Sequence, residues 1–224
     1  MIRSYLKVIK PAITQVPVDE VYRYMMIKGE VSPEVRNLVE EIMPKVLASL
    51  DCKLVYARVP VIIQGREVQL GELKAVSKDL AKNLCQIDEA IVFLATIGNG
   101  YELLKKGLLV KGADYGLCAD AIGTAAVEAL CDKFCNEIIP EITGFYSNPR
   151  FSPGYGDLAL DFQVSFLDFL QSKEAVGVNL NDTLLMTPQK SVSAITGLTA
   201  NNKTHINNCS SCQNIDCEFK RDRI

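Results

Sequence analysis

A continuous apolar run at residues 89–97, with the sequence EAIVFLATI, limits the folds open to this chain more than any other feature. Its length and its bounding glycine, Gly98, favour a strand, and a strand without polar alternation needs cover on both faces. The chain must therefore place apolar segments on two sides of one sheet. Hydrophobic residues make up 48% of its 224 residues, which is sufficient for such a core.

Helical and extended patterns follow one another here without strict alternation, which favours an α+β fold. Ser32 is a suitable N-cap ahead of Pro33 for one helix, and Pro140 is expected to end the longest helix. Helical spacing occurs at residues 18–26, 33–50, 77–85, 101–106, 113–139 and 162–171. Extended segments occur at residues 5–9, 53–63, 67–70, 176–180, 184–187 and 190–198, and residues 53–70 read as a hairpin.

The charge balance argues against nucleic-acid and membrane partners. Lys and Arg total 24 against 27 Asp and Glu, a formal net charge of −3, with no basic stripe or polybasic patch. No apolar run reaches the roughly 18 residues of a membrane span, and residues 1–11 do not resemble a secretory signal. We therefore expect a cytoplasmic protein with reduced thiols, of which five are small buried side chains: Cys52, Cys85, Cys118, Cys131 and Cys135.

The stretch Arg150-Phe151-Ser152-Pro153-Gly154-Tyr155 contains the parts of a ligand-binding loop. A proline–glycine turn exposes backbone amides and carbonyls. An arginine can bind a carboxylate through two parallel hydrogen bonds, and a tyrosine offers a ring face and a hydroxyl. These parts suit an amino-acid carboxylate or a sulfonium ligand, although a structural turn would use the same residues.

A second motif, Met-Thr-Pro-Gln-Lys-Ser-Val-Ser at residues 186–193, is by itself an ordinary strand with polar residues on one face. Between the two motifs lie an apolar helix and a short strand with Gly177, Val178 and Leu180. In this order and spacing, the segments resemble the reactivation domain of cobalamin-dependent methionine synthase. The resemblance is strongest over residues 150–197, weaker over 121–134, and general over the first hundred residues.

That resemblance implies an open, C-shaped, mainly antiparallel twisted sheet flanked by helices. In the family, the domain binds S-adenosylmethionine beside the cobalamin module. When the cofactor is oxidised to cob(II)alamin, a flavodoxin-type donor supplies an electron and S-adenosylmethionine supplies the methyl group. By resemblance, Arg150 would contact the ligand carboxylate, Tyr155 would line the groove, and the ligand-binding residues would be Glu128, Arg150, Phe151, Pro153, Gly154 and Tyr155.

Glu128 is also notable on physical grounds, because it is the only charged residue between Asp120 and Asp132 in an otherwise apolar or small-residue helix. A carboxylate in such a position either reaches solvent at a groove or needs a paired donor. As a ligand-binding residue it would accept hydrogen bonds from the ammonium or ribose of the ligand. The alternative is an exposed residue on the polar face of the helix.

The chain also departs from the family pattern. Gly156 and Asp157 follow Tyr155, where the family loop usually continues with proline, and the aromatic residues expected after the Ser-Val-Ser strand are absent. The cobalamin, homocysteine and folate modules have no counterpart in these residues, so the corrinoid would be carried by a separate protein. The interpretation requires an open cleft beside Tyr155 and an arginine that internal ion pairs have not consumed.

The polar residues 201–224 form a tail that we separate from a reactivation-like domain at residues 1–200. Cys209, Cys212 and Cys217 have a spacing that suits a zinc ion or an iron–sulfur cluster, and His205 is a weaker fourth ligand. A metal could order a tail that is too polar to fold by burial. A redox dithiol and an unstructured tail are the alternatives, and the family resemblance does not extend to this feature.

The favoured function is that of an accessory protein in methionine biosynthesis that binds S-adenosylmethionine and supports reductive remethylation of a corrinoid. The partner would be a cobalamin-binding methionine synthase or another corrinoid protein, with a flavodoxin-type or other electron donor. Positioning the methyl donor over cobalt needs no acid–base pair, so no catalytic residue is predicted. The alternatives are a metal-dependent electron-transfer protein using the C-terminal cysteines, and a corrinoid-protein docking module without ligand binding.

Overall fold

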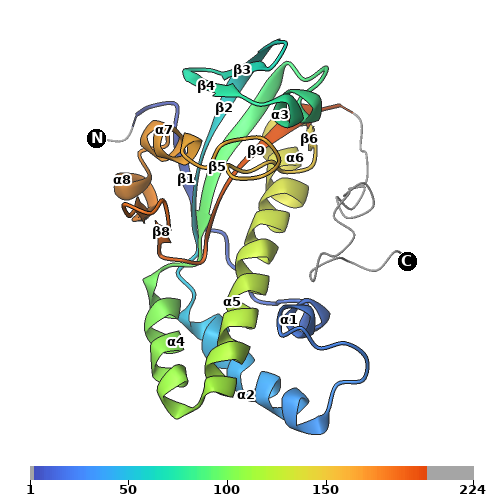
Figure 1. Ribbon diagram of the computed structural model, residues 1–224, viewed down its shortest axis with the longest axis vertical. Helices are drawn as coiled ribbons and strands as arrows, with labels where there is room; N and C mark the ends of the chain where they lie inside the picture. Colours follow the sequence, from blue (N-terminus) through green and yellow to red (C-terminus); the bar gives the residue numbers. More distant parts are fainter. Residues whose placement is uncertain (1–2, 201–224) are drawn as a thin grey trace.

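A seven-stranded sheet occupies the upper half of the computed structural model in Figure 1, and the structure describes residues 3–200. The strand order is β4-β3-β2-β5-β9-β6, with β1 pairing beside β2. Within the described residues, every strand pairing is antiparallel. The strands are β1 (Lys7–Ile9), β2 (Lys53–Gln64), β3 (Glu67–Leu70), β4 (Leu73–Val76), β5 (Glu89–Thr96), β6 (Tyr146–Ser147) and β9 (Ser191–Thr199).

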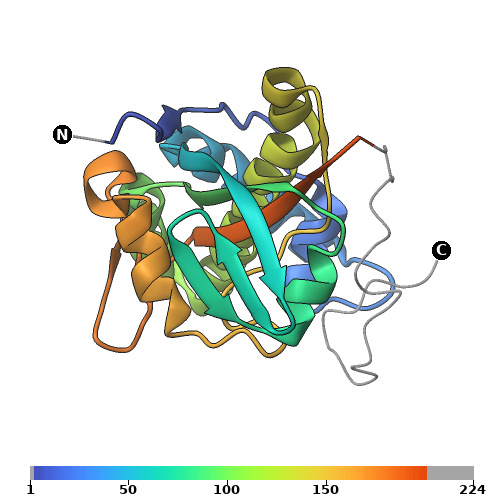
Figure 2. The ribbon, with the colours of Figure 1, turned by 90° about the horizontal axis from the view of Figure 1, so that it is seen from above.

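Helices cover both faces of this sheet, and the α+β fold predicted from the sequence is confirmed (Figures 1 and 2). The cluster on one face includes residues of α1, α2, α4 and α5, and the cluster on the other includes residues of α3, α7 and α8. The helices are α1 (Val18–Tyr24), α2 (Pro33–Ser49), α3 (Lys78–Asn83), α4 (Asn99–Lys111), α5 (Ala113–Lys133), α6 (Ile139–Thr143), α7 (Phe162–Phe169) and α8 (Ser172–Val176).

The apolar run at residues 89–97 forms β5, which lies between β2 and β9. Its side chains alternate between the two faces of the sheet. Phe93 and Ala95 belong to the core beneath α5, whereas Val92 and Leu94 belong to the core beneath α7. The strand lacks polar alternation because both of its faces are buried.

The helix α5 packs closely on α4 because its residues are small. A Cβ atom added to Gly123 would lie 2.3 Å from the Tyr101 ring, and Tyr101 is fully buried. The Tyr101 hydroxyl donates a hydrogen bond to the Ala119 carbonyl at 3.1 Å. The glycine inside this helix therefore has a packing reason, and the packing fixes the helix that carries Glu128.

The prediction that Pro140 ends the long helix is wrong. After α5 the chain forms a π-helical segment, η1 (Phe134–Ile138), and Pro140 lies in the first turn of α6. Proline is tolerated at the first turn of a helix because its missing N–H is not needed there. The widened turn of η1 lets the chain enter this new turn without a break.

Other differences are local. The strands β4 and β6 and the helix α8 were not predicted, and α4 extends beyond residue 106, where the predicted helix ended. Residues 176–180 and 184–187 form only the two-residue strands β7 (Asn179–Leu180) and β8 (Met186–Thr187), which pair with each other. Cys85 is exposed in the turn after α3 rather than buried, whereas Cys52, Cys118, Cys131 and Cys135 are buried as expected.

None of the helices within residues 3–200 combines the length and the apolar composition that crossing a bilayer requires.

Candidate functional site

The loop that begins at Arg150 contains a tight turn that its own sequence dictates. The Tyr155 N–H donates to the Ser152 carbonyl at 3.0 Å, which closes a four-residue turn with Pro153 and Gly154 at its centre. Gly154 has a φ of +83°. A type II turn requires a positive φ at its third residue, which favours glycine, and proline is common at its second residue. The turn leaves Tyr155 half-exposed at the surface.

Asp157 ties the end of this loop to the N-terminus of α3. Its carboxylate accepts hydrogen bonds from the Ser77 hydroxyl and from the backbone N–H groups of Lys78, at 2.9 Å, and Asp79, at 3.1 Å. These hydrogen bonds, from Ser77 first, lower the pKa of Asp157 to about 2. Asp157 therefore holds the end of the loop against the N-terminus of α3.

The start of the loop is fastened to β9. The Asn148 side chain accepts a hydrogen bond from the Gly197 N–H at 2.6 Å and donates one to the Asn83 carbonyl at 2.8 Å. Phe151 exchanges two backbone hydrogen bonds with Ile195, at 2.9 and 2.8 Å. The Phe151 N–H is thus already used within the fold, and its ring lies at right angles to the Tyr155 ring, with centroids 5.3 Å apart.

Arg150 reaches from this loop to α5, where it meets two carboxylates. Its Nη2 atom donates to Glu128 Oε2 at 2.9 Å and to Asp132 Oδ1 at 2.8 Å. Glu128 and Asp132 are four residues apart, so they lie on the same face of the helix. The fold therefore brings together Arg150 and Glu128, which are 22 positions apart in sequence.

The guanidinium of Arg150 is only partly satisfied by these ion pairs. Its Nη1 atom is buried and has no hydrogen-bond partner within the described part of the chain. Burial acts to lower the pKa of Arg150, and neighbours including Cys131 and Glu128 raise it by more, so the group stays charged. The predicted site needs an arginine that internal ion pairs have not consumed; Nη2 is engaged by both carboxylates, and Nη1 is unpaired but buried.

Two further groups at this place were missed by the sequence analysis. Asp132 could have been found, because it follows Glu128 by four positions on a helix. Tyr24, at the end of α1, could not, because nothing in its local sequence links it to α5. Burial first, and then the charge of Glu128, raise the pKa of the Tyr24 hydroxyl. The Tyr24 ring lies 4.2 Å from the guanidinium carbon of Arg23.

A hollow of about 440 Å³ borders the ion-pair cluster. It lies between residues 12–17 and the end of α5, and its lining includes Asp132, Lys133, Asn136 and Glu137. Asp132 therefore contacts Arg150 and also faces open space. A second hollow, of about 570 Å³, lies between α7, α8 and the β7–β8 hairpin. Neither of these two hollows is lined by residues 150–155, so neither opens beside Tyr155.

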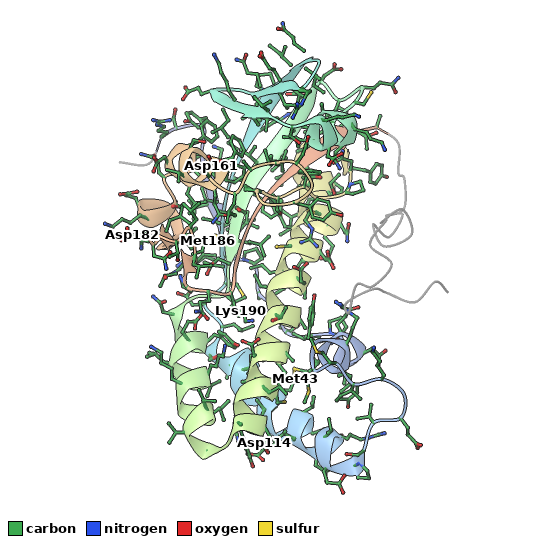
Figure 3. All side chains as sticks on the ribbon, viewed as in Figure 1. Met43, Asp114, Asp161, Asp182, Met186 and Lys190 are labelled. Atoms are coloured by element: carbon green, nitrogen blue, oxygen red, sulfur yellow. The ribbon has the colours of Figure 1, made fainter. Side chains whose placement is uncertain are left out.

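The second sequence motif lies at another part of α5. Lys190, labelled beside this helix in Figure 3, donates to Asp120 at 3.1 Å and to Thr124 at 2.7 Å. Asp120 and Glu128 are eight residues apart, or about 12 Å along the helix. The Ser191 and Ser193 hydroxyls donate to Thr96 and Gln163. In this structure the motif thus connects β9 to its neighbours.

No arrangement of three or more His, Cys, Asp or Glu side chains suited to a metal ion occurs in residues 3–200. The predicted metal ligands Cys209, Cys212 and Cys217, together with His205, lie outside the described residues.

The architecture is that of an α+β domain in which an antiparallel sheet supports a proline–glycine loop beside a long helix. More particularly, it is the fold of the MetH reactivation domain. The crystal structure of that domain bound to AdoHcy is similar to this chain with a TM-score of 0.64 and 14% sequence identity. The similarity covers 89% of this chain and 80% of that one. No family model matches the sequence, and neither does any curated protein.

Proposed function

We propose that this protein binds S-adenosylmethionine and supports the reductive remethylation of a corrinoid carried by a separate protein. The pairing of Arg150 with Glu128 carries this proposal. The sequence resemblance assigns both residues to the ligand, and they lie 2.9 Å apart although they come from a loop and a helix. The shared fold with a domain whose crystal structure holds AdoHcy adds support.

The proposed ligand matches the groups present. The carboxylate of the ligand would accept charge-assisted hydrogen bonds from the Arg150 guanidinium. Its ammonium or ribose hydroxyls would donate to Glu128. The Pro153–Gly154 turn and the half-exposed Tyr155 would form the wall of the groove beside the adenosine. The protein would act by holding the methyl group in position.

In the proposed reaction, one electron from a donor protein reduces Co(II) to Co(I), a cobalt–carbon bond forms as the carbon–sulfur bond breaks, and S-adenosylhomocysteine leaves. The partner would be a cobalamin-binding methionine synthase or another corrinoid protein, and the electron donor a flavodoxin-type protein. We place this activity in residues 1–200, within the cytoplasm. A zinc ion or an iron–sulfur cluster on Cys209, Cys212 and Cys217 is a separate hypothesis, which metal analysis of anaerobically purified protein tests.

Isothermal titration calorimetry with S-adenosylmethionine tests the ligand. We expect the wild-type chain to bind and Arg150→Gln to lose at least tenfold in affinity, because a charge-assisted pair contributes about 1.5–3 kcal/mol. Arg58→Gln is the matched control, since Arg58 also pairs with a glutamate, Glu89 at 2.9 Å, but on another part of the sheet. It should bind as the wild type does.

Two outcomes would contradict the proposal. Wild-type protein that does not bind S-adenosylmethionine rejects the ligand. Equal affinities of the wild type and Arg150→Gln remove Arg150 from the site. Should Arg150→Gln fail to fold, as judged by circular dichroism, Glu128→Gln provides the same comparison, since it keeps the shape of the side chain and removes its charge.

A further inference from the structure

We propose that Asp132 makes this site selective for charge, so that it retains positively charged S-adenosylmethionine and releases neutral S-adenosylhomocysteine. The inference rests on the proposed function and extends it to a residue that the sequence resemblance does not assign. It concerns the difference in affinity between the methyl donor and its product.

The charges around Arg150 do not balance. Arg150 contributes one positive charge, and Glu128 and Asp132, both bound to its Nη2, contribute two negative charges. Two other pairs of opposite charges lie nearby. Arg23 forms an ion pair with Glu20, and Lys133 and Glu137 line the same hollow with opposite charges. The cluster therefore has a formal net charge of −1.

The two ligands differ by one charge and one methyl group. S-adenosylmethionine carries a sulfonium, an ammonium and a carboxylate, and its net charge is +1. S-adenosylhomocysteine has a thioether instead of the sulfonium, and its net charge is zero. A cluster with net charge −1 thus complements the donor and not the product. Loss of the methyl cation removes the charge that the cluster attracts.

Asp132 is the carboxylate best placed to act on a ligand. Its side chain is 52% exposed, against 38% for Glu128, and it lines the hollow of about 440 Å³ next to the cluster. Glu128 alone can still neutralise Arg150 when Asp132 loses its charge. Substitution of Asp132 should therefore change the net charge of the site from −1 to zero without leaving Arg150 unpaired.

The experiment compares affinities for S-adenosylmethionine, S-adenosylhomocysteine and sinefungin, in which a carbon atom bearing a charged amino group replaces the methylated sulfur. In Asp132→Asn we expect the ratio of the affinity for S-adenosylmethionine to that for S-adenosylhomocysteine to fall about fivefold, which corresponds to the contribution of a partly exposed ion pair. Affinity for S-adenosylhomocysteine should change less than twofold, and sinefungin should follow the donor. Added salt should reduce the wild-type preference and leave that of the variant unchanged.

Glu141→Gln is the control, because it removes one negative charge from an exposed residue on α6 that does not line the hollow. It should keep the wild-type preference. A second variant, Asp132→Ser, is measured in parallel to separate charge from amide-specific contacts, and it also replaces Asp132→Asn if that protein does not fold.

A folded Asp132 variant that binds both ligands with the wild-type preference overturns the inference and leaves the proposed function intact. Wild-type protein that binds neither ligand overturns the proposed function and the inference with it. A wild-type protein that binds both ligands equally overturns the inference alone.

Discussion

Replacing Gly123 with alanine should destabilise the protein, although alanine is the better helix former. The added Cβ would lie 2.3 Å from Tyr101 Cζ and 2.5 Å from the Tyr101 hydroxyl oxygen. The ring is fully buried, so it cannot swing into solvent. Either α4 must move away from α5, or the ring must leave its position and lose its hydrogen bond to Ala119.

The magnitude follows from three opposing terms. Overpacking a well-packed core costs about 1–3 kcal/mol, and a lost hydrogen bond costs about 1 kcal/mol more. The gain in helix propensity from glycine to alanine offsets about 1 kcal/mol. The net loss is about 1–3 kcal/mol, which for a chain of this size lowers the melting temperature by roughly 2–12 °C.

Gly107→Ala in α4 is the matched control, because a Cβ atom there meets nothing within 4 Å. The same substitution should stabilise the protein by about 0.5–1 kcal/mol, so the two variants should shift in opposite directions. Thermal and urea unfolding of both proteins, followed by circular dichroism, measure the shifts. If Gly123→Ala were as stable as the wild type or more so, the close packing of α5 on Tyr101 would be refuted.

Three other substitutions or reactions examine the loop and the thiols. Asp157→Asn should reduce stability near neutral pH. Because the folded-state pKa is about 2, the difference should persist above pH 4 and disappear as the pH falls towards about 2, as acid titrations of both proteins would reveal. Arg150→Met should lower the free energy of unfolding, measured with urea, by about 1–2 kcal/mol, because the partly exposed carboxylates of Glu128 and Asp132 lose the cation between them. An unchanged urea midpoint would mean that this ion-pair cluster does not stabilise the fold. Cys85 should be alkylated in the native protein while Cys131 is not, because burial raises the pKa of the Cys131 thiol and excludes the reagent. Peptide mapping would contradict this prediction if it found both cysteines modified at equal rates.

The sheet could be predicted from the sequence where a strand carries its own signal. The apolar run at residues 89–97 predicts a strand buried on both faces, and β5 is buried on both faces of the sheet. Ser32 caps α2 as expected, accepting from the Val35 N–H at 3.4 Å. By contrast, β4 was missed although it pairs with the neighbouring strand β3, and β7 and β8 are shorter than the extended segments predicted there. The extent of such short strands depends on their pairing context, which a local pattern does not encode.

The candidate site was predicted only in part, for a similar reason. The loop at 150–155 and Glu128 were selected because their motifs resemble a known family, and local chemistry agrees with that choice. Tyr24 reaches α5 through the packing of α1, which no local pattern reveals. Asp157 was noted only as a departure from the family loop, yet its carboxylate fastens the loop to α3.

The ion pairs of Arg150 raise the question of how one side chain can hold a loop and also bind a ligand. Asp132 is half-exposed, so its carboxylate can turn towards solvent without the cost of burying an unpaired charge. A ligand carboxylate that takes its place on Nη2 restores a charge-assisted hydrogen bond of the same kind. Such an exchange conserves the number and type of bonds to Arg150, so the loop stays attached to α5 with the ligand present or absent. The ion pairs are then compatible with the proposed site, because the guanidinium exchanges one carboxylate for another and Glu128 keeps its place.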